Sequence, residues 1–187
     1  MATISTTLVT GATAYPVTIE EIKHEFRIDH KHDDSMIETY IATATELCEH
    51  ELSRQIKAAT WDMFLDEFPS GRYPIELRYN PVSSVTSVTY YDVDNASQTW
   101  ASSKYDTALN AEPARIMPID TESYPDTYSR PEAVTVRFVT GYTTVPPTIK
   151  TAVRILVGNW YDARVESGVM TPGVIRLLDA SRYTVEF

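Results

Sequence analysis

The sequence contains a single cysteine, Cys48, which excludes an internal disulfide bond. Cys48 falls among the apolar positions of a helical pattern, and this predicts a small buried core residue. The alternative is a reactive thiol, which would need nearby cations to lower its pKa. Its neighbours in the sequence instead include Glu46, Glu49 and Glu51. We therefore expect a structural role for this residue.

Long apolar runs and a basic leader are also missing. No stretch reaches the roughly 18 apolar residues typical of a membrane-spanning helix, so we expect no transmembrane segment. The N-terminal residues show neither a basic region nor a long apolar core, so we expect no signal peptide. The hydrophobic fraction of 43% in 187 residues is still sufficient for a packed core.

Positive charge is scarce, because 16 Lys and Arg residues stand against 26 Asp and Glu residues. The formal net charge of −10 opposes approach to a phosphate backbone, which disfavours general nucleic-acid binding. The same charge would allow DNA to slide past the protein without adhering to it.

Known catalytic motifs are missing as well. The sequence contains no G-x-S-x-G elbow, no Walker loop and no G-x-G-x-x-G, and its six glycines are scattered. His24 and His50 each begin a His-Glu pair like that of zinc proteases, but Ile28 and Arg54 stand where the second histidine would be needed. We therefore predict no catalytic residue and no cofactor.

The loop DHKHDD is the best candidate for a metal site. His30, His32, Asp33 and Asp34 could direct two imidazoles and two carboxylates toward one ion. The alternative is a solvated acidic loop that caps the following helix. We favour this alternative and predict no bound metal.

Two helices are expected near the N-terminus. Thr18 and Glu21 have the spacing of a capping box, which predicts a helix that ends near Arg27. Apolar residues then recur every three or four positions, which predicts a second helix from about Ser35 to Arg54. Glu49 is assigned to the polar face of that helix.

The middle of the chain shows the residue pattern of antiparallel strands. Alternating apolar residues in TWDMFLDEF and IELRY, separated by the turn PSGRYP, predict a hairpin. Further strands are expected in SVTSVTYYDV, SQTW, residues 114–117 and AVTVRFVTGY, and PIDTESYPDTYSRPE is expected to be a long loop.

Helical periodicity returns near the C-terminus. Two prolines open a helix expected over Thr148–Val165, with an apolar stripe, and Gly158 would let a neighbouring element approach closely. Pro172 is expected to begin a short helix that runs through Leu178. Residues 181–187 form a tail.

This order of elements predicts an α+β fold. The N- and C-terminal helices would form a helical bundle, with an antiparallel β insertion between them. We expect a single domain over residues 1–187, with helices in 18–57, the β insertion in 58–142, helices in 146–180 and the tail in 181–187.

Aromatic side chains are abundant, with 12 Tyr and 3 Trp. An aromatic β surface would suit a sugar or a peptide, whereas aromatics also fill cores and anchor protein interfaces. The acidic charge and the missing catalytic set favour the interface interpretation.

The order of these segments resembles the head–tail connector proteins of tailed bacteriophages, also called adaptors or head-completion proteins. The matching segments are TIEEIKHEFRID, DDSMIETYIATATELCEHEL, W-x-M-x-L-D-x-F-P, P-V-S-S-V-T-S-V-T-Y-Y-D, AVTVRFVTGY and PPTIKTAVRILVGNWYDAR. They span residues 17–165. The proline-rich loop 118–131 and the tail match least well.

The resemblance implies a structural virion protein at the neck, made in the host cytoplasm and assembled into a ring of about twelve copies. The ring would sit under the portal protein, hold a stopper or tail-terminator protein, and let DNA pass without specific binding. It would make no membrane contact. Gene transfer agents use similar particles, so either kind of particle is expected.

The ring predicts that some surface residues contact other proteins. On the last long helix these are Trp160, Tyr161 and Arg164, with intramolecular core packing as the alternative for each. In the tail they are Tyr183, Val185 and Phe187, whose alternation would suit strand addition to a partner's sheet edge, with a frayed terminus as the alternative.

Other functions stay open at this point. A tail-completion or other neck protein would share the class but have different partners. A carbohydrate-binding module or hydrolase built on the β region is the alternative outside that class.

Overall fold

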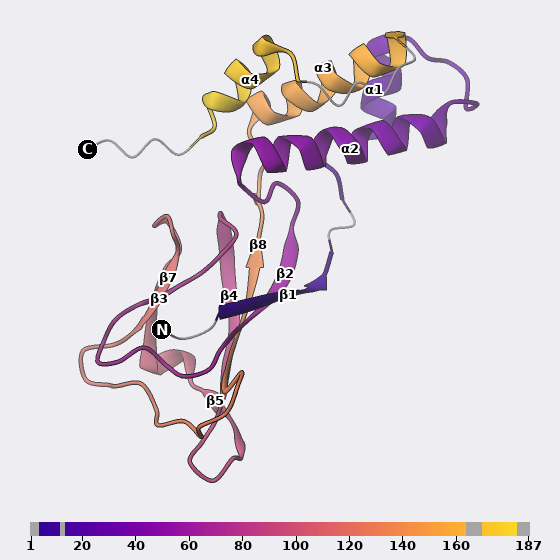
Figure 1. Cartoon of the computed structure of the whole chain (residues 1–187). Helices are drawn as coiled ribbons and strands as arrows, with labels where there is room; N and C mark the ends of the chain where they lie inside the picture. The colour runs from indigo at the N-terminus through magenta and orange to yellow at the C-terminus, as the bar shows by residue number, and fades with distance from the viewer. Residues whose placement is uncertain (1–3, 12–13, 164–169, 183–187) are drawn as a thin grey trace. The chain divides into compact units, whose positions relative to one another are not determined.

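The computed structural model describes residues 4–11, 14–163 and 170–182, which fall into two compact units. The β unit comprises residues 1–12 and 58–143, and the helical unit comprises 13–57 and 144–187. The predicted α+β class, with antiparallel strands between N- and C-terminal helices, is confirmed (Figure 1). The grouping of both units into one domain over 1–187 stays a prediction.

The larger sheet of the β unit is antiparallel and has the strand order β1-β2-β8-β4-β5. Its strands are β1 (Ile4–Thr10), β2 (Ala59–Leu65), β8 (Val134–Thr140), β4 (Val82–Tyr91) and β5 (Ser97–Trp100). The central strand β8 follows the expected alternation, because Val134, Val136 and Phe138 all face one side and are fully buried.

A smaller antiparallel sheet has the order β3-β7-β6. It consists of β3 (Ile75–Glu76), β7 (Arg115–Pro118) and β6 (Tyr105–Ala108), and a short 3₁₀ turn, η1 (Ser102–Lys104), precedes β6. Ile75 and Ile116 pair across this sheet and join Met63, Val88 and Phe138 of the larger sheet in one apolar cluster. Burial between the two sheets is therefore what stabilises the β unit.

The predicted hairpin between TWDMFLDEF and IELRY is wrong. The strand β2 pairs with β1 and β8, whereas β3 pairs with β7 in the other sheet. The turn residues between them instead carry the chain from one sheet to the other. The strand β1 was not expected, although the β-branched run ISTTLVT is typical of a strand.

In the helical unit, α1 (Ile19–Phe26) and α2 (Asp34–Leu52) form close to where they are predicted. The capping box is present, because Thr18 Oγ1 accepts from Glu21 N at 3.2 Å and Glu21 Oε2 accepts from Thr18 N at 2.8 Å. Arg27 caps the C-terminal end of α1 in a left-handed conformation with φ of 56°, so this helix stops where it is predicted to stop.

The C-terminal helices are α3 (Pro147–Ala163) and α4 (Pro172–Asp179). The predicted stripe of α3 is buried, with Ile149, Val153 and Leu156 at most 1% exposed, and α3 packs against α1, α2 and α4. Gly158 lies against Phe26 of α1, so the close approach expected at this glycine is confirmed. In the described part of the chain, no helix is both long and apolar enough to cross a membrane.

Candidate interaction surfaces

Trp160, a predicted contact residue, lies inside the helical unit. It is 3% exposed, and its ring meets that of Tyr40 edge-on, with the ring centroids 5.9 Å apart. This packing corresponds to the intramolecular alternative for Trp160. A contact between Trp160 and another protein stays a prediction.

Tyr161 follows on the same helix and is half-buried. Its hydroxyl donates to Asp33 Oδ2 at 2.9 Å, which ties the end of α3 to the residue before α2. Its contact with a neighbour stays a prediction, as does that of the other four residues. Those four, Arg164, Tyr183, Val185 and Phe187, lie outside the described residues.

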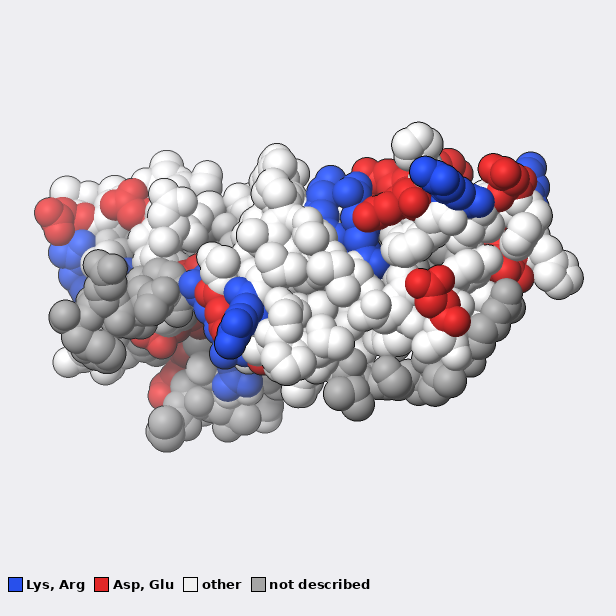
Figure 2. All heavy atoms as spheres, turned by 90° about the horizontal axis from the view of Figure 1, so that it is seen from above, with Lys and Arg blue, Asp and Glu red and all other residues white. Residues whose placement is uncertain are grey.

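The exposed side of α3 is uncharged along its middle. Thr151, Ile155 and Asn159 recur every four residues on that side, and Ile155 is 38% exposed. Figure 2 shows a broad uncharged area in the middle of the face of the helical unit seen there, with charged side chains gathered toward either end. Uncharged surface of this kind can meet another protein without a desolvation cost for charges.

Charged side chains also join α1 and α3. Arg154 Nη2 of α3 lies 3.3 Å from Glu21 Oε1, and Arg154 Nε lies 3.7 Å from Glu25 Oε2. Both contacts are partly exposed, so they contribute modestly to stability. They link α1 to α3 at the surface of the helical unit.

The histidine loop between α1 and α2 uses its polar groups within the fold. Lys23 Nζ bonds Asp34 Oδ1 at 2.6 Å and also donates to the carbonyl oxygen of His30, while Asp33 accepts from Tyr161. Among the described residues, no group of three or more His, Cys, Asp or Glu is arranged to hold a metal ion.

Cys48 is fully buried in α2, as the sequence predicted. Burial, together with the smaller effect of the negative charges of Glu49 and Glu51, raises the pKa of its thiol from 9.0 to about 12. A thiol held in this way is protonated at neutral pH and is a poor nucleophile.

Several aromatic residues of the β unit fill its core. Phe68, Trp100 and Tyr105 are between 3% and 8% exposed. Phe68 stacks on Tyr124 with ring centroids 5.0 Å apart, and Trp100 lies 4.8 Å from Tyr105. These rings are therefore not a platform for a sugar, and a sequence pattern alone could not separate the two uses.

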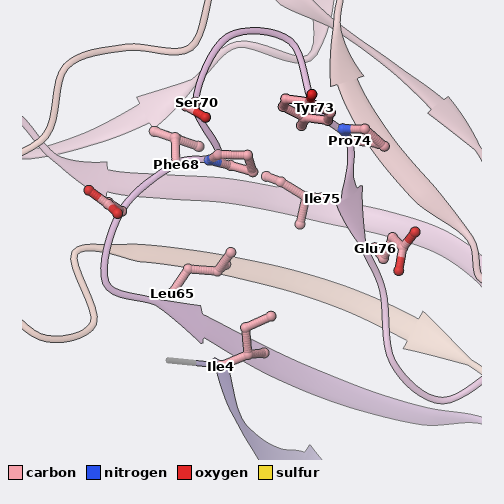
Figure 3. A pocket seen from close by; sticks show the side chains of 10 residues that line it. Ile4, Leu65, Phe68, Ser70, Tyr73, Pro74, Ile75 and Glu76 are labelled. Atoms are coloured by element: carbon pink, nitrogen blue, oxygen red, sulfur yellow. The ribbon is translucent and has the colours of Figure 1, made fainter. Parts of the chain in front are cut away.

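The β unit has an open cavity of about 640 Å³ between the edge strands of its two sheets. Figure 3 shows Ile4 of β1 and Leu65 of β2 on one side and Ile75 of β3 on the other, with Phe68 and Tyr73 in the connecting segment. We call this opening the β seam, defined by these five residues. Its lining also includes Glu67 and Glu76, which are exposed acids.

The segment that connects β2 to β3 and borders the β seam is held in place by hydrogen bonds. Arg72 bonds Asp120 Oδ1 at 2.7 Å and the carbonyl oxygen of Pro118 at 2.9 Å, and Tyr124 donates its hydroxyl to the carbonyl oxygen of Tyr73 at 2.8 Å. The Tyr73 side chain is nevertheless 72% exposed. A large aromatic on a fixed backbone is suited to an interface, because little conformational entropy is lost on binding.

The tip of the β4–β5 hairpin is a second exposed apolar point, where Val93 is 62% exposed. The adjacent Asp92 carboxylate accepts from the backbone N–H of Ala96 and from Gln98 Nε2, and these bonds lower the pKa of Asp92. The carboxylate is thus occupied in holding the turn.

Comparison with protein families gives one match over most of the chain. The family model described as "HCP: Head completion protein" matches residues 17–173. A comparison with curated proteins gave no match.

Three similar solved structures come from gene transfer agent (GTA) particles. A chain of the virion of a native particle has a TM-score of 0.74 at 16% identity, with 97% of each chain covered. A chain of the neck of an empty particle, computed with C6 symmetry, has a TM-score of 0.74 at 18% identity, covering 98% of this chain and 97% of that one. A chain of the neck of a native particle, computed with C12 symmetry, has a TM-score of 0.70 at 20% identity with the same coverage. At these identities the likeness establishes the fold.

Proposed function

Because this chain belongs to the head completion protein family, we propose that it is the adaptor of a head–tail neck, a structural virion protein that joins the portal to the tail. The observation that carries this proposal is the family match, which spans residues 17–173 and so includes both units. Nearly complete coverage of neck-particle chains in both directions supports it.

The adaptor acts as a ring of about twelve copies. The C6 and C12 symmetries with which the similar neck structures were computed support this number. A ring needs a heterologous interface, in which one surface of a copy meets a different surface of the next. The exposed uncharged side of α3 and the β seam are two such surfaces, and they lie in different units.

The ring has proteins on both sides and DNA through its centre. The portal protein lies above it and a stopper or tail-terminator protein below it. The net charge of −10 supports a wall that repels phosphate, so that DNA passes without specific binding. This wall serves packaging and ejection alike, in a phage or in a gene transfer agent.

The role is structural rather than catalytic. The burial of Phe68, Trp100 and Tyr105 in the β core argues against the carbohydrate-binding alternative. The raised pKa of Cys48 argues against a thiol nucleophile. The exposed features of both units are better suited to contacts with proteins.

The test is to delete the gene in the producing strain and to image the particles by electron microscopy. We expect DNA-filled heads without attached tails, and tail attachment restored by the gene supplied in trans. An epitope-tagged protein should be found at the neck. Normal tailed particles in the deletion strain, or the tagged protein located away from the neck, would overturn the proposal.

A further inference from the structure

Three strands of the larger sheet have an end at the same place. Leu65, the last residue of β2, and Tyr90, near the end of β4, both pair with Val134, the first residue of β8. The segment 92–95 continues from β4 into the turn before β5, and the segment 126–132 leads into β8 (Figure 1). We call these two segments the β tip.

Specific contacts hold the two segments of the β tip together. The backbone N–H of Tyr128 donates to the carbonyl oxygen of Tyr91, the last residue of β4, at 3.0 Å. Arg130 Cζ lies 4.0 Å from the centre of the Tyr91 ring, and Arg130 Nη1 donates to Asn95 Oδ1 at 3.3 Å. The β tip therefore presents its side chains from a fixed backbone, which limits the conformational entropy that is lost on binding.

Two apolar side chains project from the β tip. Val93 is 62% exposed and Tyr128 is 44% exposed. Tyrosine is one of the residue types that contribute most to the binding free energy of protein interfaces. The charges beside these two side chains indicate what kind of partner would cover them.

Those charges are mostly negative. The β tip contains four acids, Asp92, Asp94, Asp126 and Glu132, and a single base, Arg130. Asp94, Asp126 and Glu132 are exposed, and within the part of the chain that the structure describes none of them forms an ion pair. The guanidinium of Arg130 is directed to the hairpin instead. The exposed apolar side chains are thus flanked by acids whose charge is not neutralised.

This negative charge selects among the possible partners. DNA phosphate and an anionic lipid surface would both be repelled. A second copy of the chain, with its net charge of −10, would bring further acids. A protein surface with Lys and Arg around an apolar depression would instead pair the acids at its rim and cover Val93 and Tyr128 at its centre.

We propose that the β tip docks into such a basic-rimmed apolar depression on a different protein of the neck. The inference rests on the proposed function, and it assigns the docking surface and the chemistry of the partner. Val93 and Tyr128 supply the apolar contact. Asp94 and Asp126 steer the approach and orient the docked pair.

The test places a photo-cross-linker in assembled particles. In a producing strain that lacks the native gene, p-benzoylphenylalanine replaces Tyr128, and purified particles are irradiated and analysed by mass spectrometry. We expect a covalent product with one other particle protein, at a segment where Lys or Arg residues flank apolar ones. The matched control carries the same group at Tyr15, which is 43% exposed and belongs to the helical unit. It should give at least about ten-fold less of that product, because it is not held beside the partner.

Charge reversal tests the electrostatic part of the inference. Asp94→Lys combined with Asp126→Lys should lower the cross-link at Tyr128 at least about ten-fold, because like charges would then face each other. Asp29→Lys combined with Asp106→Lys makes the same change in net charge at exposed acids outside the β tip. This control should leave the cross-link within about two-fold of its original yield. Both double variants should unfold at the same urea concentration as the original chain, which verifies that they fold.

Several outcomes would refute the inference. They are a cross-link from Tyr128 to DNA or to a second copy of the chain, a linked segment without Lys or Arg, and equal yields of the product at Tyr128 and Tyr15. Equal losses in the two double variants would refute it too, as would no product in particles whose tagged protein lies at the neck. A tagged protein found away from the neck refutes the proposed function, and this separate measurement distinguishes that result from a failed docking contact.

Discussion

Gly158→Ala is the substitution for which the structure makes the sharpest prediction. A Cβ at position 158 would lie 2.2 Å from Phe26 Cζ and 2.6 Å from Phe26 Cε1. Carbon atoms in contact normally lie about 3.5–4.0 Å apart, so the ring of Phe26 has to move by more than an ångström. The substitution therefore perturbs the packing between α1 and α3.

Two opposing effects determine the magnitude. Alanine is about 1 kcal/mol more favourable than glycine within a helix. Overpacking of a fitted core costs about 1–3 kcal/mol, and an overlap of this size falls in the upper part of that range. The net loss of unfolding free energy is then about 1–2 kcal/mol, which lowers Tm by roughly 3–6 °C in a chain of this length.

The assay is urea unfolding followed by circular dichroism at the helical band, in a double-mutant cycle with Phe26→Ala. Without the ring, Gly158→Ala should stabilise the protein by about 1 kcal/mol, because only the helix propensity remains. The sign of the effect should thus reverse between the two backgrounds. If Gly158→Ala stabilises the otherwise unchanged chain, the close contact and the reasoning built on it are refuted.

Two further predictions concern α2. Cys48 should react with DTNB only after unfolding, because a pKa raised from 9.0 to about 12 lowers the thiolate fraction about 1,000-fold at a given pH below 9; rapid reaction of the folded protein would contradict this. Glu49→Ala should cost about 1–3 kcal/mol in urea unfolding, because Glu49 Oε1 accepts from the backbone N–H groups of Ile56 at 2.8 Å and Lys57 at 3.0 Å. Glu46→Ala, on the same helix but with a side chain 69% exposed, is the control and should change stability by less than about 0.5 kcal/mol; equal losses would show that the backbone contacts of Glu49 contribute nothing.

The helices were predictable because their signals are local. The capping box at Thr18 and Glu21 forms as expected, since both partners lie within one turn. The periodicity of α2 set both ends of that helix to within about two residues, and the paired prolines Pro146 and Pro147 set the start of α3 to within about one residue. The predicted contact of Gly158 also holds, although its partner Phe26 could not be named from sequence.

Strand pairing was predicted less well, because it depends on residues far apart in the chain. The turn PSGRYP lies between two strands that join different sheets, so a local turn signal led to the wrong pairing. The prediction for Glu49 was incomplete for the same reason, because its contacts also come from residues outside its own helix. Its helical position assigns it to the solvated face, yet the chain folds back and brings two backbone N–H groups to its carboxylate.

The candidate interaction surfaces also differ in whether the sequence alone could reveal them. The alternation of Tyr183, Val185 and Phe187 can be recognised in the sequence, because it needs only the two-residue period of a strand. The β seam cannot, because it exists only where the open edges of two sheets meet.

By itself, the sequence determined the helices, most strands, the α+β class and the resemblance to head-completion proteins, since each rests on periodicity, capping or segment order along the chain. The tertiary structure alone decided which strands pair, that Trp160 is buried against Tyr40, and that Ile4, Leu65 and Ile75 surround one cavity. Those outcomes depend on packing between segments distant in sequence, and no local pattern records which distant surface a side chain will meet.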